Sequence, residues 1–167
     1  MDAFPGIEPF DGLGQLRPDQ LASLYDQRKS VTAVQFQFAE VVDRAFALQD
    51  MTSFAEILQH YDAPLPWVPA AVKRWLEEQP DAVSGLGKLE RLALDAMRVG
   101  CETPVEVFAS VAKNDTHPQY WGDTTLWGKL NALAYRDPPL IRIEGPGGKL
   151  PQWGGSIDDR AYRLHLV

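Results

Sequence analysis

The stretch DTTLWGKLNALAYRDPPLIRIEG, residues 123–145, contains the change from helix to strand on which the fold depends. Leucines recur at helical spacing through its first half, and Asp123 is a good helix cap, so a helix is predicted to begin there. Asp137-Pro138-Pro139 ends the helix, because proline cannot continue it. Leu140–Glu144 is rich in branched apolar residues and bounded by Pro and Gly, which predicts a strand.

The segments on either side of this stretch predict further elements. Residues 145–148 predict a turn, and residues 161–166 suit a returning strand. Upstream, leucines line one face of a helix over residues 86–97, and a second helix starts at the cap Thr103. The order helix, helix, helix, strand, long loop, strand is that of a winged helix, in which the third helix is the recognition element.

The N-terminal half predicts helices only. Residues 1–16 are rich in Pro and Gly and are expected to form an extended arm, and residues 17–79 are expected to form four helices. Thr32 and Gln35 form a capping box at the start of the clearest amphipathic helix. Apolar residues recur along its predicted buried face at Val34, Phe38, Val41, Ala45 and Leu48. The predicted fold is therefore mostly α, with an N-terminal helical unit followed by a winged-helix-like three-helix unit that ends in a β-hairpin.

The charge is unevenly distributed between the two halves. The chain of 167 residues has a formal charge of −7. Residues 1–83 hold 6 basic and 13 acidic side chains, whereas residues 84–167 hold 10 of each. This shift, next to a Pro- and Gly-containing linker near 79–85, predicts an acidic helical domain at 1–83 and a winged-helix-like domain at 84–167. Acidity argues against sequence-independent binding to phosphate backbones, but only for the first half.

Composition excludes several other classes. A single cysteine, Cys101, rules out an internal disulfide framework and favours a reducing compartment. No apolar run reaches the length of about 18 residues that a membrane span needs, and the first residues do not resemble a signal peptide. We therefore expect a cytoplasmic protein.

Four segments together resemble a bacterial protein family. In chain order they are FPGIEPFDGLGQLRPDQLASLY, LPWVPAAVKRWLEE, GLGKLERLALDAM and WGDTTLWGKLNALA. They are similar to the C-terminal portion of proteins with domain of unknown function 1835 and its companion, domain of unknown function 3658, over most of residues 4–136. Gly87 stands where the family usually has Ser, which weakens the cap of that helix.

The resemblance implies a bacterial source and this domain layout, and it brings no established activity. Family members usually carry an additional N-terminal α/β domain to which nothing here corresponds. One hypothesis is therefore that this chain is the accessory C-terminal half of an enzyme whose α/β domain lies outside it.

The sequence carries no recognised catalytic motif. Phosphate-binding loops, dinucleotide fingerprints, nucleophile elbows and metal-ligand spacings are all missing. We predict no catalytic residues, no metal and no cofactor. This favours a non-catalytic protein but leaves open whether the chain takes part in an enzyme.

Two hypotheses remain for a non-catalytic protein. A DNA-binding regulator would read DNA through the outward residues of the third helix and the hairpin. These are Thr124, Thr125, Lys129, Asn131, Arg136, Arg142 and Arg163. A protein-binding or self-associating module would use the aromatic cluster of the second half as its anchors, because aromatic residues are enriched at interfaces. These are Tyr120, Trp121, Trp127 and Trp153. The second hypothesis is the leading one.

Overall fold

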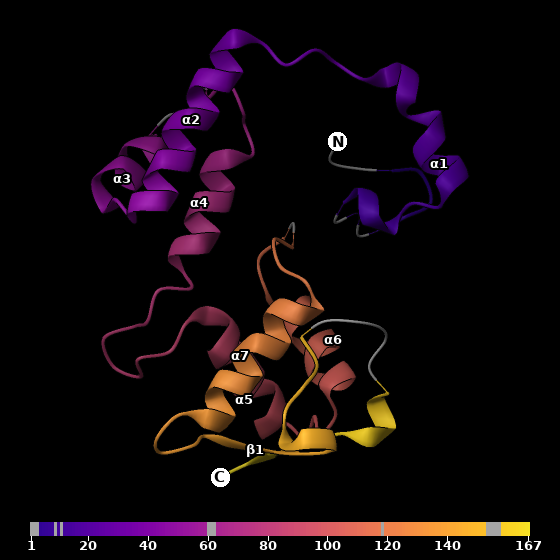
Figure 1. The fold of residues 1–167 in the computed structure, drawn as a ribbon, viewed down its shortest axis with the longest axis vertical. Helices are drawn as coiled ribbons and strands as arrows, with labels where there is room; N and C mark the ends of the chain where they lie inside the picture. Colours follow the sequence, from indigo (N-terminus) through magenta and orange to yellow (C-terminus); the bar gives the residue numbers. More distant parts are fainter. Residues whose placement is uncertain (1–3, 9, 11, 60–62, 118, 153–157) are drawn as a thin grey trace. The chain divides into compact units, whose positions relative to one another are not determined.

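The computed structural model describes residues 4–8, 10, 12–59, 63–117, 119–152 and 158–167 (Figure 1). The chain divides into two compact units, Met1–Leu76 and Glu77–Val167. The α-helices of unit 1 are α1 (Pro18–Ser23), α2 (Ala33–Leu48), α3 (Met51–Gln59) and α4 (Val68–Leu76). Unit 2 contains α5 (Lys88–Arg98), α6 (Pro104–Asn114), α7 (Asp123–Tyr135), β1 (Ile141–Glu144) and β2 (Arg163–Leu166). Short 3-10 turns lie at Leu13–Gln15, Tyr25–Gln27, Pro146–Gly148 and Asp159–Ala161.

The predicted fold class is confirmed. The described residues are mostly helical and end in an antiparallel two-stranded hairpin. Ile141 pairs with Leu166 and Ile143 with Leu164 across the two strands. Buried and exposed residues alternate along β1, so one face of the hairpin turns toward the core.

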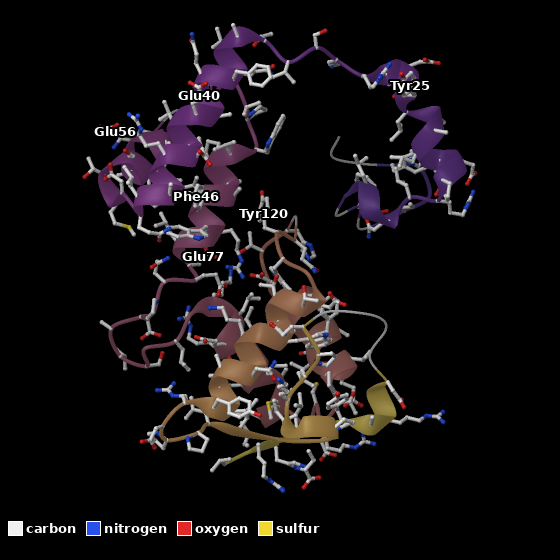
Figure 2. All side chains as sticks on the ribbon, in the orientation of Figure 1. Tyr25, Glu40, Phe46, Glu56, Glu77 and Tyr120 are labelled. Atoms are coloured by element: carbon white, nitrogen blue, oxygen red, sulfur yellow. The ribbon has the colours of Figure 1, made fainter. Side chains whose placement is uncertain are left out.

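Helix α2 of unit 1 starts where local chemistry predicts it. At α2 the Gln35 backbone N–H donates to the Thr32 hydroxyl at 3.2 Å, and the Thr32 N–H donates to the Gln35 side chain at 3.0 Å. This is the predicted capping box. Phe46 lies between α2 and α4 (Figure 2), and its ring centroid is 5.0 Å from that of Trp75.

The prediction for the buried face of α2 is only half right. Phe38 and Ala45 do pack toward α3 and α4, together with Val42 and Phe46. The side chains of Val34, Val41 and Leu48 are instead 59%, 53% and 70% exposed. The apolar arc of α2 is therefore wider than the surface that α3 and α4 cover.

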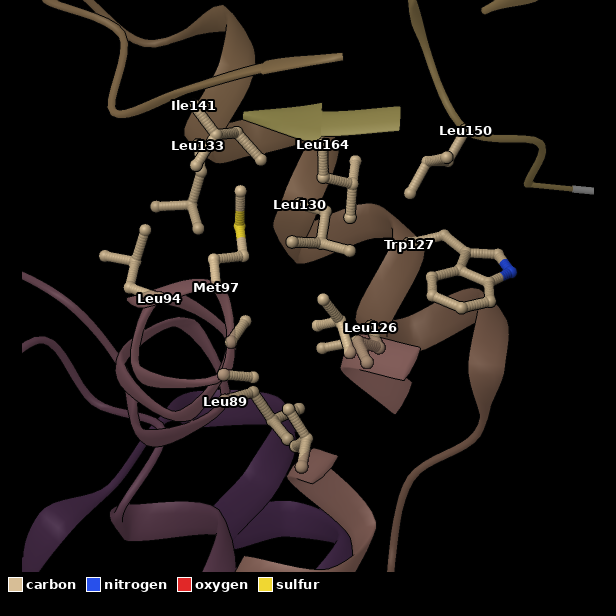
Figure 3. Packing of buried hydrophobic residues seen from close by; sticks show 14 of the residues in the cluster. Leu89, Leu94, Met97, Leu126, Trp127, Leu130, Leu133, Ile141, Leu150 and Leu164 are labelled. Carbon is tan, nitrogen blue, oxygen red and sulfur yellow. The ribbon is translucent and has the colours of Figure 1, made fainter. Parts of the chain in front are cut away.

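Unit 2 has one continuous apolar core between its three helices and its hairpin (Figure 3). Leu89 and Met97 enter it from α5, Leu130 from α7, and Ile141 and Leu164 from the hairpin. Each of these side chains is at most 7% exposed. The hairpin thus closes the core that the helices form.

The segment between α4 and α5 folds with unit 2. The Lys88 N–H donates to the Glu77 carbonyl at 3.0 Å, and the Asp81 N–H donates to the Leu86 carbonyl at 3.2 Å. The boundary of the compact units therefore lies between Leu76 and Glu77, several residues before the 83/84 boundary that charge distribution predicts.

Candidate functional site

The face of α7 predicted to read DNA is partly covered by the chain that follows β1. The Asn131 amide donates to the Leu150 carbonyl at 2.9 Å and accepts from the Leu150 N–H at 2.8 Å. About two helical turns away, the Gln152 side chain donates to the Thr124 carbonyl at 3.4 Å. Asn131 thus fixes the loop after β1 instead of pointing into solvent.

Lys129 of α7 is placed against an acidic side chain. Its ammonium nitrogen lies 3.9 Å from Glu78 Oε2, and the Lys129 side chain is 33% exposed. Glu78 also accepts a hydrogen bond at 3.0 Å from the Leu89 N–H, in the first turn of α5. Glu78 therefore supplies, from outside the helix, the cap that Gly87 cannot provide.

The other two acidic residues of this segment are paired in the same way. Glu77 lies 2.7 Å from the Lys88 ammonium, and Asp81 lies 3.1 Å from the Arg91 guanidinium. We call Glu77, Glu78 and Asp81 the acidic strap. With the strap included, unit 2 holds 10 basic and 13 acidic residues, a net charge of −3 rather than the zero of residues 84–167.

The basic residues of the hairpin are also paired. Arg142 lies 2.6 Å from Glu144, whose other carboxylate oxygen is 3.2 Å from His165. These contacts with His165 and Arg142 hold the pKa of Glu144 below its ordinary value. Arg163 donates to the Tyr162 carbonyl at 2.8 Å. The positive charge available to a phosphate backbone from this hairpin is accordingly reduced.

The remaining predicted DNA contacts lie at the surface. Thr124, Thr125 and Arg136 are exposed on or just after α7. Arg136 is exposed, and within the part of the chain that the structure describes no ion pair involves it, in contrast to Lys129 and Arg142. The structure thus places Thr124 and Thr125 at the start of α7 and Arg136 just after its end. The ion pairs of Lys129 and Arg142 leave little unbalanced positive charge among the predicted residues.

Two of the predicted aromatic anchors are structural. Trp127 is 4% exposed and belongs to the core of unit 2, so it is not a surface anchor as predicted. Trp121 is half-buried, with its ring centroid 5.3 Å from Phe108 and its indole N–H donating to Asp115 Oδ2 at 2.6 Å. Tyr120 is 40% exposed, and Trp153 lies outside the described residues.

Asp115 is a buried carboxylate held by two donors. Besides Trp121, it pairs at 3.1 Å with Lys88, which also donates to Thr116 at 2.7 Å. Burial opposes the charge of Lys88, but its hydrogen bonds to Glu77 and Asp115 outweigh this and raise its pKa. A lysine held protonated is a poor nucleophile or general base. This cluster therefore joins α5 to the loop after α6 and offers no obvious chemistry.

No group of metal-ligating side chains assembles within the described residues. Cys101 is half-buried against the core of unit 2, whereas His117 is exposed. Among the helices described, none combines the length and the apolar character required to cross a bilayer.

The surface that sequence reasoning missed is in unit 1. Large apolar side chains are exposed on α2 at Val34, Phe36, Val41 and Leu48, and Trp67 before α4 is 54% exposed. The sequence does carry a pattern that indicates this surface, because apolar residues recur every seven positions at 34, 41 and 48. In the structure these positions lie beside the face of α2 that α3 and α4 cover.

Neither a family model, nor a curated protein, nor a solved structure matches this chain.

Proposed function

We propose that this chain is a non-catalytic interaction module that binds another protein chain through unit 1. In this proposal unit 2 is a winged-helix-like scaffold, and the helical unit 1 supplies the contact surface. The observation that carries the proposal is the set of exposed apolar side chains on one side of α2, where Val34, Val41 and Leu48 are all at least 53% exposed. Clustered apolar surface of this kind marks interaction sites in soluble proteins.

The small core of unit 1 supports the same proposal. Its fully buried apolar residues are Ala45, Phe54, Ile57 and Val72. Helical segments of this size gain most of their stability from burying an amphipathic face. A partner that covers the rest of α2 would add to a core that is otherwise minimal.

Site-specific photo-crosslinking tests the proposal directly. A photoreactive phenylalanine analogue is placed in turn at Val34, Leu48 and Trp67, and the full chain is irradiated in the cells that express it. We expect a discrete protein–protein product from at least one of these positions. The control is the same analogue at Val99, which is 79% exposed in unit 2. Failure of all three unit 1 positions to crosslink would contradict the proposal.

DNA binding is the second candidate, and the order of α5, α6, α7 and the hairpin supports it. The ion pairs of Lys129 and Arg142 count against it. Fluorescence anisotropy with duplex DNA at low salt tests this candidate. A DNA-binding protein would bind in a salt-sensitive way and would be weakened by Arg136→Ala. If binding is seen and unit 1 does not crosslink, the second candidate replaces the first.

A third candidate stays open, in which the chain is the accessory half of an enzyme. The resemblance to the family with domain of unknown function 1835 supports this candidate. A location in the bacterial cytoplasm is part of the same proposal. Sequencing the genomic region upstream of Met1 tests this candidate, because an in-frame extension that encodes strands and helices would support it and a stop codon close upstream would contradict it. Hydrolysis of a nucleotide or ester by the purified chain, lost on mutation of His117 or Cys101, would instead contradict the non-catalytic first proposal.

A further inference from the structure

The exposed stripe on α2 has the geometry of a helix–helix seam. Val34, Val41 and Leu48, which we call the α2 stripe, are spaced by seven residues. At 3.6 residues per turn, each lies about 20° behind the one before, which is the drift of a left-handed helix pair. The stripe borders Phe38 and Ala45, which face the core of unit 1, so apolar surface continues from the core to solvent.

We propose that the α2 stripe binds the α2 stripe of a second copy of this chain, with the two helices antiparallel. This inference rests on the proposed function and names its partner. In such a pair the two-fold axis passes near Val41, so that each Val41 faces its counterpart. Val34 of one copy then lies against Leu48 of the other.

Charges on one flank of the stripe select this arrangement. Glu40 and Arg44 are both exposed on α2 and flank Val41 on the same side. Within the described residues no ion pair joins them to each other. In the antiparallel pair Glu40 of one copy lies about 3 Å along the axis from Arg44 of the other, since each residue advances 1.5 Å. The pairing occurs twice because of the two-fold symmetry.

The expected dimer is weak. A seam between two helices of this length is smaller than the interface of roughly 1,200–2,000 Å² that stable complexes bury. We therefore expect a monomer–dimer equilibrium that shifts with concentration, not a permanent dimer.

Sedimentation velocity on the full chain, over about a hundredfold range of concentration, tests the dimer. Wild-type protein is expected to shift from monomer to dimer across this range. Val41→Asp places two like charges face to face and is expected to leave only monomer. Phe36→Asp is the matched control for Val34→Asp, because both side chains are 59% exposed on the same helix but point to different sides. We expect Val34→Asp to weaken the dimer and Phe36→Asp to leave it unchanged.

A charge exchange tests the antiparallel arrangement. Glu40→Arg and Arg44→Glu are each expected to weaken the dimer at least severalfold, and the double exchange is expected to restore it. Circular dichroism of each variant checks that the helices are retained. A wild-type chain that stays monomeric over the whole range would overturn the dimer. Crosslinking of unit 1 to a different protein would then leave the proposed function standing, whereas a lack of any crosslink would remove both.

Discussion

The two units are similar in length but differ in how much apolar surface they bury. Among the residues that the structure describes, the core of unit 2 contains seventeen buried hydrophobic residues, whereas that of unit 1 contains four. Unit 1 nevertheless exposes more large apolar side chains than unit 2 does. Both units are helical, so this contrast does not come from secondary structure. It comes from the hairpin and the loop between its two strands, which cover one side of the helices in unit 2 and have no counterpart among the described residues of unit 1.

The largest expected effect comes from truncating the core of unit 2. Leu130 is 0% exposed, and Leu130→Ala is expected to lower the free energy of unfolding by about 2–5 kcal/mol through lost burial and a residual cavity. Leu48→Ala in unit 1, at 70% exposure, is expected to change it by less than about 0.5 kcal/mol in dilute protein. Urea unfolding measures both. Equal losses would show that the contrast between the units is not energetic.

The second prediction concerns the N-terminal boundary of unit 2, where the acidic strap packs against Gly87. A Cβ at Gly87 would lie 2.7 Å from the Glu78 carbonyl oxygen, so the acidic strap fits only beside glycine. Gly87→Ala is expected to destabilise unit 2 by about 1–3 kcal/mol. Gly122, which precedes α7 in the same way, has open space around it, and Gly122→Ala is the matched control. If both variants unfold like wild type, the strap does not belong to unit 2 in solution.

A smaller effect is expected from the hydrogen bonds that hold the loop onto α7. Asn131→Ala removes both hydrogen bonds to the Leu150 backbone, so the N–H and the carbonyl of Leu150 lose their partner. We expect a loss of about 1–2 kcal/mol and faster hydrogen exchange of the loop. The control is Asn114→Ala, because Asn114 bonds only within its own exposed helix end. Unchanged exchange at Leu150 would contradict the role given to Asn131.

How far the sequence predicts the structure depends on the range of the interaction. The capping boxes at Thr32 and Thr103 are local, and both form as predicted. The cap that Glu78 provides for α5 comes from eleven residues away and leaves no local pattern. For the same reason Lys129 was predicted to contact DNA, although the structure places it near Glu78.

The faces of helices show the same limit. Periodicity identifies an apolar arc but not the part of it that neighbours cover. The α2 stripe was therefore assigned to the core, whereas Trp127 was assigned to a surface although its ring is buried.

The smallest expected effect compares one aspartate in each unit. Asp50 and Asp81 both accept hydrogen bonds from a serine hydroxyl and from two following N–H groups, and Asp81 also pairs with Arg91. The serine hydroxyl is the main cause that lowers the pKa of each carboxyl, with Arg91 adding to the effect at Asp81.

A carboxyl whose pKa is lower in the folded than in the unfolded chain stabilises the fold above its unfolded pKa of about 4, and this stabilisation is lost as the pH falls below that value. We therefore expect both Asp50→Asn and Asp81→Asn to reduce stability near neutral pH and to lessen its decline in acid. Because Asp81 has the additional partner, its variant is expected to show the larger change when urea unfolding is compared at about pH 7 and about pH 3. An equal change at the two sites would mean that the pair with Arg91 adds nothing beyond the local turn, and that the strap is held to unit 2 by the side chains of Glu77 and Glu78 and by its backbone contacts.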